Sequence, residues 1–196
     1  MTISFEYDDE AAGKADRVGI DAGPHIGKFT SVNSMKSREK QTEGMHFEFE
    51  SSDGSTTGFD LWTQERTWQG YNQMMAMMTI LGLRGLKSVT GKYEAWVDGK
   101  REEVTGETFP ELCGKDIGLV FQKELYSKGD GSDGARYGLV GVFHPTTRLT
   151  ASEIRERKTT PEKLDKIVRG LKVKDTRKPR AEEPSQPSVG ANAGSY

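Results

Sequence analysis

Side chains that could catalyse a reaction or bind a metal are few in this sequence, and their spacing matches no catalytic motif. Neither His25 nor His46 has a carboxylate or cysteine at metal-ligand spacing beside it along the chain. The two histidines are expected on neighbouring strands, where they could form a metal pair or remain partly exposed strand residues. Acidic residues are plentiful, but no pair of them falls in a recognisable catalytic motif. These patterns predict a protein that is not an enzyme and needs no metal or cofactor.

The one cysteine and the glycine-rich segment offer no further chemistry. Cys113 by itself excludes an internal disulfide framework and a cysteine-based zinc site, which is typical of a reducing cytoplasm. With no base beside it, Cys113 is interpreted as a small buried side chain. Residues 127–135, SKGDGSDGA, precede a predicted strand instead of a helix, so they match no phosphate-binding loop. They lack the terminal glutamate of a calcium-binding EF-hand, and we interpret them as a long hairpin loop.

Aromatic and basic side chains interleave along the predicted strands. This pattern is typical of proteins that hold single-stranded nucleic acid, because cations follow the phosphates and flat rings stack on bases, at ~1–3 kcal/mol per base. The stacking candidates are Phe29, Trp62, Tyr126 and Tyr137. The phosphate-binding candidates are Lys28, Lys36, Arg38, Lys40, Lys123, Lys128 and Arg136. Trp62 is the strongest ring, since its neighbours of the same strand parity are polar. A hydrophobic core surrounded by solvated charges is the alternative interpretation of the same residues.

The charges are divided unevenly along the chain. The net charge is −2 overall, but residues 1–150 are acidic, whereas residues 151–180 hold 11 Lys and Arg against 5 Asp and Glu. The acidic body alone does not indicate a nucleic-acid binder. The basic segment 155–180 is either an electrostatic arm that contacts phosphates or a solvated helix face with ordinary i,i+4 ion pairs.

Hydrophobic periodicity predicts the elements that must position these residues. Alternation predicts strands at 25–33, 45–50, 56–64, 117–126 and 136–144, and a hairpin at 93–104 around Asp98-Gly99. Apolar spacing of three and four predicts a helix over 66–82. Its methionines, Met74 to Met78, either fill the core or form an adaptable binding groove. Thr150 and Glu153 form a capping box that opens a helix, and a second short helix is expected from Pro161 to Arg169.

This order of elements predicts a mainly β fold. Three strands, a helix and two more strands are typical of a five-stranded OB-type barrel, here with an inserted hairpin and a C-terminal helical extension. An antiparallel sandwich with a covering helix is the alternative. In an OB barrel the loops joining strands one to two and four to five bind the ligand, here residues 34–43 and 127–135.

The domain organisation follows from the same patterns. We expect a flexible lead-in at 1–17, an OB-type domain at 18–150, a basic helical extension at 151–174 and a disordered tail at 175–196. The apolar run 74–83 is far shorter than the ~20 residues of a membrane helix, and the N-terminus lacks a signal-peptide pattern, so no membrane association is expected.

Two stretches of this sequence resemble a family of phage and prophage single-stranded DNA-binding proteins. They are GPHIGKFTSVNSMKSREKQTEGMHFEFESSDGSTTGFDLWT, with a helix ending MMAMMTILGLR, and FPELCGKDIGLVFQKELYSKGDGSDGARYGLVGVFHPTTRLTASEI. The resemblance covers roughly residues 18–155. It implies an OB fold that binds single-stranded DNA without sequence preference during phage DNA replication and recombination, in the host cell cytoplasm. It implies protection of unpaired strands by binding alone.

The chain departs from the wider pattern of single-strand binders in its tail. Many such proteins end in a strongly acidic tail that docks partner proteins, whereas here Lys178 and Arg180 precede Glu182 and Glu183. Replication or recombination proteins could bind this tail, and a homo-oligomer is compatible with the sequence. The alternative function is an OB-type interaction module that docks a recombinase or polymerase without binding DNA strongly itself.

Overall fold

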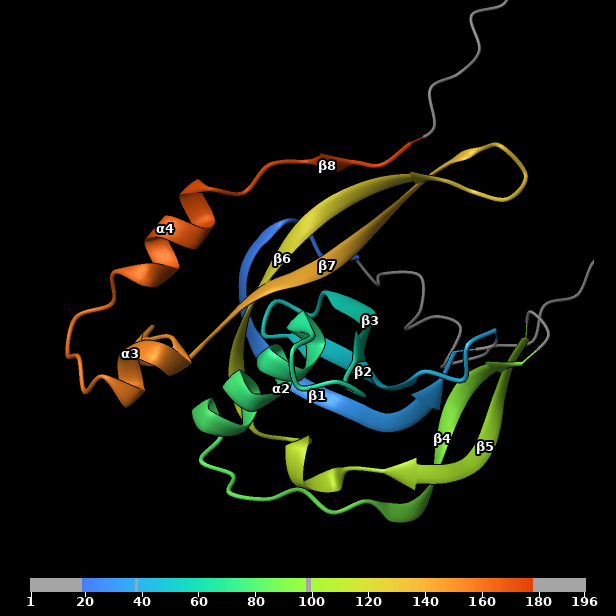
Figure 1. The fold of residues 1–196 in the computed structure, drawn as a ribbon, viewed down its shortest axis with the longest axis horizontal. Helices are drawn as coiled ribbons and strands as arrows, with labels where there is room; N and C mark the ends of the chain where they lie inside the picture. The colour runs from blue at the N-terminus through green and yellow to red at the C-terminus, as the bar shows by residue number, and fades with distance from the viewer. Residues whose placement is uncertain (1–18, 38, 98–99, 178–196) are drawn as a thin grey trace, which may run out of the picture.

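The computed structural model describes residues 19–37, 39–97 and 100–177 and is mainly β, with 48% strand and 17% helix (Figure 1). In chain order the elements are β1 (Gly23–Lys36), β2 (Glu43–Ser51), β3 (Thr56–Trp62), α2 (Gln69–Ile80), β4 (Val89–Val97), β5 (Lys100–Thr108), a 3-10 turn η1 (Pro110–Leu112), β6 (Asp116–Ser127), β7 (Asp133–Phe143), α3 (Ala151–Arg155), α4 (Lys163–Arg169) and β8 (Lys174–Asp175).

The described strands form one sheet, in which β1 is the central strand. β1 pairs with β6 through Gly23 to Lys28 and with β2 through Gly27 to Lys36. β2 continues to β3, β6 continues to β7, and the β4–β5 hairpin joins β1 only at the pair Asn33–Thr108. All of these pairings are antiparallel, whereas the two-residue β8 runs parallel to β6.

β3 and β7 lie close together, but among the described residues no hydrogen-bonded ladder joins them. The structure therefore confirms a mainly β fold with the predicted order of elements, as an open sheet of eight strands.

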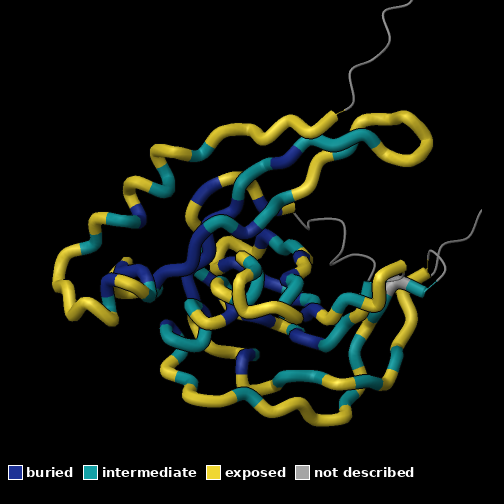
Figure 2. Tube along the Cα trace, viewed as in Figure 1, coloured by how far each residue is buried: buried dark blue, intermediate teal, exposed yellow. Residues whose placement is uncertain are grey.

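Five phenylalanines from four strands form the centre of the core. Phe47 on β2 and Phe59 on β3 are cross-strand partners, and their parallel rings lie 5.1 Å apart. The ring of Phe29 lies 5.2 Å from Phe47 and 6.0 Å from Phe49, and Phe121 from β6 closes the group against Phe59. Such tilted and offset ring pairs stabilise a core beyond the area they bury. Figure 2 shows the buried residues concentrated toward the middle of the molecule.

The prediction that Phe29 stacks on a base is wrong, because only 1% of its surface is exposed. Simple alternation places Phe29 and Val32 on opposite faces of the strand, yet both are buried. The reason is a β-bulge between Phe29 and Ser31, which inserts an extra residue and reverses the parity that follows.

Helix α2 covers the core beside β3 and β7. Met74 and Met77 are buried, and Met78 packs against the same cluster, so the methionines fill the core instead of lining an open groove. Met75 is 38% exposed on the outer side. The helix begins at Gln69, three residues later than predicted, and Trp68 precedes it as the N-cap residue in an extended conformation.

The two C-terminal helices are joined by the carboxylate of Glu153. The predicted capping box is confirmed: Glu153 Oε2 accepts hydrogen bonds from the backbone N–H and the hydroxyl of Thr150, both at 2.8 Å. Its other oxygen accepts from the backbone N–H groups of Glu162 and Lys163, at 2.8 and 2.9 Å, where α4 begins. Glu153 is fully buried, so one carboxylate connects the starts of both helices.

The predicted loop 127–135 is largely a strand hairpin. The β6–β7 ladder continues to the pair Ser127–Asp133, and Asp130 closes the tip by accepting hydrogen bonds from the backbone and hydroxyl of Ser132. Residues 175–177, assigned to the tail from the sequence, lie against β6, where Thr176 N–H donates to the Leu125 carbonyl. The predicted lead-in at 1–17 and the rest of the tail, 178–196, lie outside the described residues.

Candidate nucleic-acid interface

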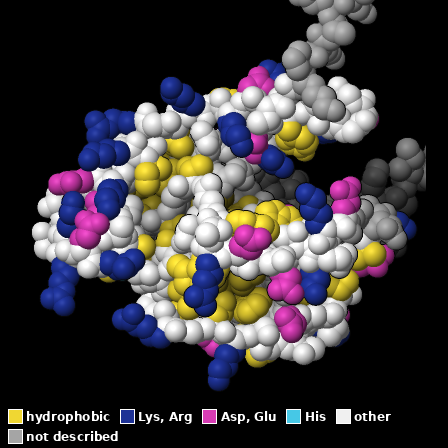
Figure 3. Space-filling view, in the orientation of Figure 1, with side chains coloured by type: hydrophobic (Ala, Val, Ile, Leu, Met, Phe, Trp, Pro, Cys, Tyr) yellow, Lys and Arg dark blue, Asp and Glu magenta, His cyan; other side chains and the backbone are white. Residues whose placement is uncertain are grey.

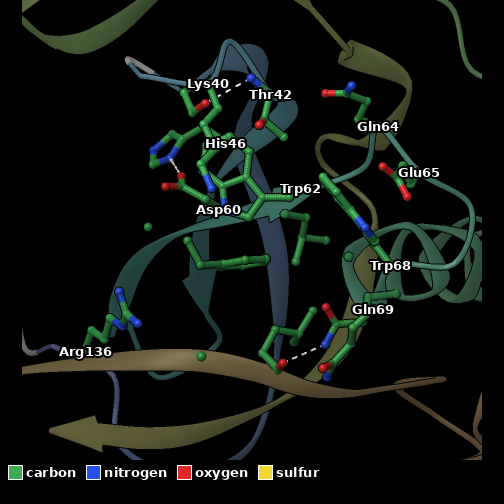
Figure 4. Close-up of a pocket in the computed structure, with 18 of the residues that line it drawn as sticks. Lys40, Thr42, His46, Asp60, Trp62, Gln64, Glu65, Trp68, Gln69 and Arg136 are labelled. Carbon is green, nitrogen blue, oxygen red and sulfur yellow. Dashed lines mark hydrogen bonds and ion pairs between the residues drawn. The ribbon is translucent and has the colours of Figure 1, made fainter. Parts of the chain in front are cut away.

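A groove of about 1310 Å³ lies along the open seam of the sheet. Its walls are the edge of β3, the connection between β1 and β2, the start of α2 and the facing part of β7. Figure 4 shows Lys40, His46 and Trp62 on one side of this groove, Trp68 ahead of α2, and Arg136 on β7 across from them. Of the eleven predicted binding residues, the structure brings Lys40, Trp62 and Arg136 together here.

Trp62 is the predicted ring that lines the groove. Phe59 and Leu61 on the same strand are buried, whereas Trp62 is half-buried at the end of β3, as its polar neighbours of the same parity predicted. The indole lies against Gly44 on β2, where an added Cβ would come within 2.8 Å of Trp62 Cε3. Gly44 therefore lets the ring rest against the backbone of the neighbouring strand.

Trp68 and three glutamines are groove residues that sequence reasoning missed. Trp68 fits the apolar spacing that predicts the helix over 66–82, so the sequence did not single it out for binding. Helix α2 begins only at Gln69, and Trp68 lies half-buried beside the groove. Gln64, Gln69 and Gln73 add amide groups to the lining. Gln73 Nε2 donates to the carbonyl of Leu139 at 2.6 Å and so connects α2 to β7.

Arg136 lies between a carboxylate and an aromatic ring. Its Nε donates to Glu124 Oε2 at 2.8 Å, and its guanidinium carbon lies 5.4 Å from the ring centre of Tyr126. Lys174 from β8 contacts the other oxygen of Glu124 at 2.8 Å. These two cations hold the pKa of Glu124 below its usual range. The Arg136 side chain is still 63% exposed, so it can reach a ligand while its base is held in place.

His46 forms a charged network on the groove wall. Its Nδ1 lies 2.7 Å from Asp60, its cross-strand partner, and its Nε2 lies 3.4 Å from Glu48. These two hydrogen bonds raise the pKa of His46 to about 9, so the imidazole is a cation at neutral pH. Glu48 in turn contacts Arg101 of β5 at 3.3 Å. The sequence reasoning missed Asp60 because it comes beside His46 only through strand pairing, whereas alternation along the strand 45–50 already places Glu48 on the same face as His46.

The described lining residues contain more acidic than basic groups. The carboxylates are Glu39, Asp60, Glu65 and Glu124, and the cations are Lys40, Arg136 and protonated His46. The groove is therefore equipped with rings and amides, and its own charge does not attract a phosphate backbone.

The other predicted residues that the structure describes are not among the lining residues of the groove. Lys28 is exposed on β1 between Glu50 and Asp116, and Lys36 forms an ion pair of 3.5 Å with Glu43. Tyr137 is partly buried against the core, and Lys123 is its half-buried cross-strand neighbour.

The remaining three predicted residues are Tyr126, Lys128 and Arg38. Tyr126 is half-buried beneath Arg136, and Lys128 is exposed at the hairpin tip. Arg38 lies outside the described residues.

Other chemistry finds little support in the described part of the chain. No group of three or more His, Cys, Asp or Glu side chains there could hold a metal ion. Cys113 is half-buried, and the loss of hydration raises the pKa of its thiol, which disfavours the reactive thiolate. Within residues 19–37, 39–97 and 100–177, the helices are too short or too polar to cross a lipid bilayer.

Comparison with known proteins gives no assignment: no protein-family model and no curated protein matches this sequence.

Proposed function

We propose that this protein binds single-stranded DNA without sequence preference, and that its sheet is an OB-type barrel opened at the β3–β7 seam. The resemblance of residues 18–155 to phage and prophage single-strand binders supports the same function. The protein would coat and protect unpaired strands during phage DNA replication or recombination, by binding and without cleaving them.

The observation that carries this proposal is the pair of half-buried tryptophans beside one open groove. Trp62 is the last residue of β3, and Trp68 is the residue directly before α2. Both line the groove. Both rings are half-buried, and that of Trp62 lies against Gly44, so less conformational freedom is lost when a base stacks on them than for exposed side chains. Glutamine amides and the exposed Lys40 supply hydrogen bonds that suit sugar, phosphate and base edges alike.

The connectivity around the seam supports an OB-type topology. Three consecutive strands precede α2, and two strands follow the inserted β4–β5 hairpin. β1 pairs with both β2 and β6, as the long first strand of such a barrel must. α2 bridges the seam through its packing on β3 and β7 and through the Gln73 hydrogen bond.

The acidic lining of the groove favours a second candidate function. Carboxylates outnumber Lys and Arg among the described lining residues, which suits a basic peptide segment of a partner protein better than a phosphate chain. In this alternative the protein is an OB-type module that docks a recombinase or polymerase.

Tryptophan fluorescence with oligo(dT) separates the two functions. Stacking on Trp62 or Trp68 should quench emission at low salt, and the quenching should decrease as salt rises. Trp62→Phe and Trp68→Phe should each remove part of the quenching. Tyr93→Phe is the matched control, since Tyr93 belongs to β4 and lines a separate pocket beside Glu48 and Arg101. Unchanged emission in the wild-type protein, together with no gel shift, would overturn the proposal in favour of the docking module. Magnesium-dependent loss of the oligonucleotide would indicate a nuclease instead.

A further inference from the structure

The chain segment 155–174 forms a strongly basic surface, here called the basic arm. It begins at the last residue of α3, includes α4 and ends at the first residue of β8. It holds eight Lys and Arg against three Asp and Glu. Figure 3 shows Lys and Arg side chains gathered over α3 and α4.

Most cations of the basic arm are not neutralised by carboxylates within the described structure. Ion pairs engage three of them: Lys158 and Lys163 contact Glu156, and Lys174 contacts Glu124. The other five are exposed and have no ion-pair partner among the described residues. They are Arg155, Arg157, Lys166, Arg169 and Lys172. The third acidic residue, Asp165, lies at the start of α4, and its backbone carbonyl accepts from Arg169.

The basic arm is held rigidly against the sheet. Glu153 ties the start of α3 to the start of α4 through four hydrogen bonds. Leu164 of α4 is buried with Val120 and Phe143, and Ile167 lies against Gly141. Beyond α4, Gln122 donates to the carbonyl of Lys172. The backbone that carries the exposed cations is therefore held in place, whereas the backbone of a solvated charged tail would have to be ordered at an entropic cost on binding.

The basic arm also adjoins the elements that line the groove. α3 contacts α2, and α4 packs on β7; α2 and β7 contribute Gln73 and Leu139 to the groove lining. The elements α2 and β7 therefore connect the groove to the basic arm. The basic arm thus carries the cations that the groove lacks.

We propose that the basic arm is a second contact surface for the phosphate backbone of the same single-stranded nucleic acid that stacks in the groove. This inference rests on the proposed function. The groove supplies stacking, and the basic arm supplies most of the electrostatic attraction. Binding should then depend steeply on salt even though the groove itself is acidic.

A salt titration with matched charge variants tests this division. The arm variant carries Arg155→Gln, Lys166→Gln and Lys172→Gln. The control carries Lys87→Gln, Lys100→Gln and Lys115→Gln, three exposed cations outside both surfaces that also have no ion-pair partner in the described structure. Both variants lose the same total charge. Binding of oligo(dT) of about 30 nucleotides is measured by anisotropy from low to moderate salt.

The expected result concerns the slope of log affinity against log salt. Each lost contact to single-stranded phosphate lowers this slope by about 0.7, so the arm variant should lose about 2 and the control almost nothing. Equal slopes in the arm variant and the control would overturn the inference about the basic arm. In that case the proposed function still holds if the wild-type protein binds oligo(dT) and its tryptophan emission is quenched. A wild-type protein that does not bind oligo(dT) at all overturns both. Circular dichroism and urea unfolding of each variant exclude a folding defect as the cause of a changed slope.

Discussion

The groove and the basic arm differ in almost every property that matters for binding a nucleic acid. The groove presents two half-buried indole rings and three glutamines, and its carboxylates outnumber its Lys and Arg. The basic arm presents five exposed cations without ion-pair partners in the described structure. The difference indicates that stacking and electrostatic attraction are supplied by different elements. A variant of the groove should therefore weaken stacking and leave the salt dependence of binding unchanged. A variant of the basic arm should reduce the salt dependence and leave stacking in place.

The largest expected effect tests whether the basic arm is a rigid surface. Glu153→Gln removes the negative charge that accepts four hydrogen bonds in a fully buried site and leaves an amide N–H₂ against backbone donors. The free energy of unfolding should fall by about 2–3 kcal/mol, measured by urea denaturation. Hydrogen exchange should increase first in α3 and α4. Glu156→Gln is the control, because Glu156 makes only exposed ion pairs in the described structure; a similar loss there would contradict the role given to Glu153.

The same residue predicts sensitivity to acid. Backbone hydrogen bonds outweigh the opposing effect of burial and lower the pKa of Glu153 from 4.5 to about 2. The stabilisation is therefore present above about pH 4.5 and is lost as the pH falls toward 2. Wild-type stability measured over this range should decline more steeply than that of Glu153→Gln, and parallel curves would be evidence against this assignment.

The next effect separates stacking from charge. Trp62→Ala with Trp68→Ala should weaken oligo(dT) binding by about 1–3 kcal/mol for each base that loses its ring, while the slope against salt remains that of the wild type. This outcome is the converse of the one expected for the arm variant. Fluorescence anisotropy of a labelled oligonucleotide measures both quantities. A fall in slope as large as that of the arm variant would show that the two surfaces are not independent.

A smaller effect concerns the groove wall at alkaline pH. The pKa of His46 is raised from 6.5 to about 9 by Asp60 and Glu48, so the protonated form stabilises the folded state. This contribution is complete below about pH 6.5 and is lost as the pH rises through 9. Because these side chains are partly exposed, we expect about 1 kcal/mol, measured by unfolding at pH 6 and at pH 9.5. His46→Gln should abolish the difference, and His25→Gln should retain it.

The smallest expected effect is the contribution of a groove cation to the salt dependence of binding. Lys40 is exposed on the groove rim, so Lys40→Gln should lower the slope against salt by at most about 0.7, a third of the change expected for the arm variant. The same salt titration provides the measurement. A larger change would place the electrostatic component in the groove and so remove the contrast between the two surfaces.

The sequence by itself determined the elements and their order, because these depend on local patterns. Alternation located β2 and β3, and the Thr150–Glu153 spacing identified the start of α3. Periodicity also located α2, although its first turn was predicted too early. The basic segment was identified from composition alone, because charge is a property of the residues themselves.

Tertiary structure alone decided which residues share a surface. A bulge after Phe29 put Phe29 and Val32 on the same buried side, the late start of α2 left Trp68 beside the groove, and strand pairing placed Asp60 against His46. Each of these depends on register or on a single-residue shift, and a one-residue change in a strand moves a side chain to the opposite face. Glu153 likewise meets the start of α4 only through the tertiary arrangement of the two helices. The placement of the groove beside the basic arm has the same origin, since long-range contacts that bring β3, β7 and α4 together leave no local signal in the chain.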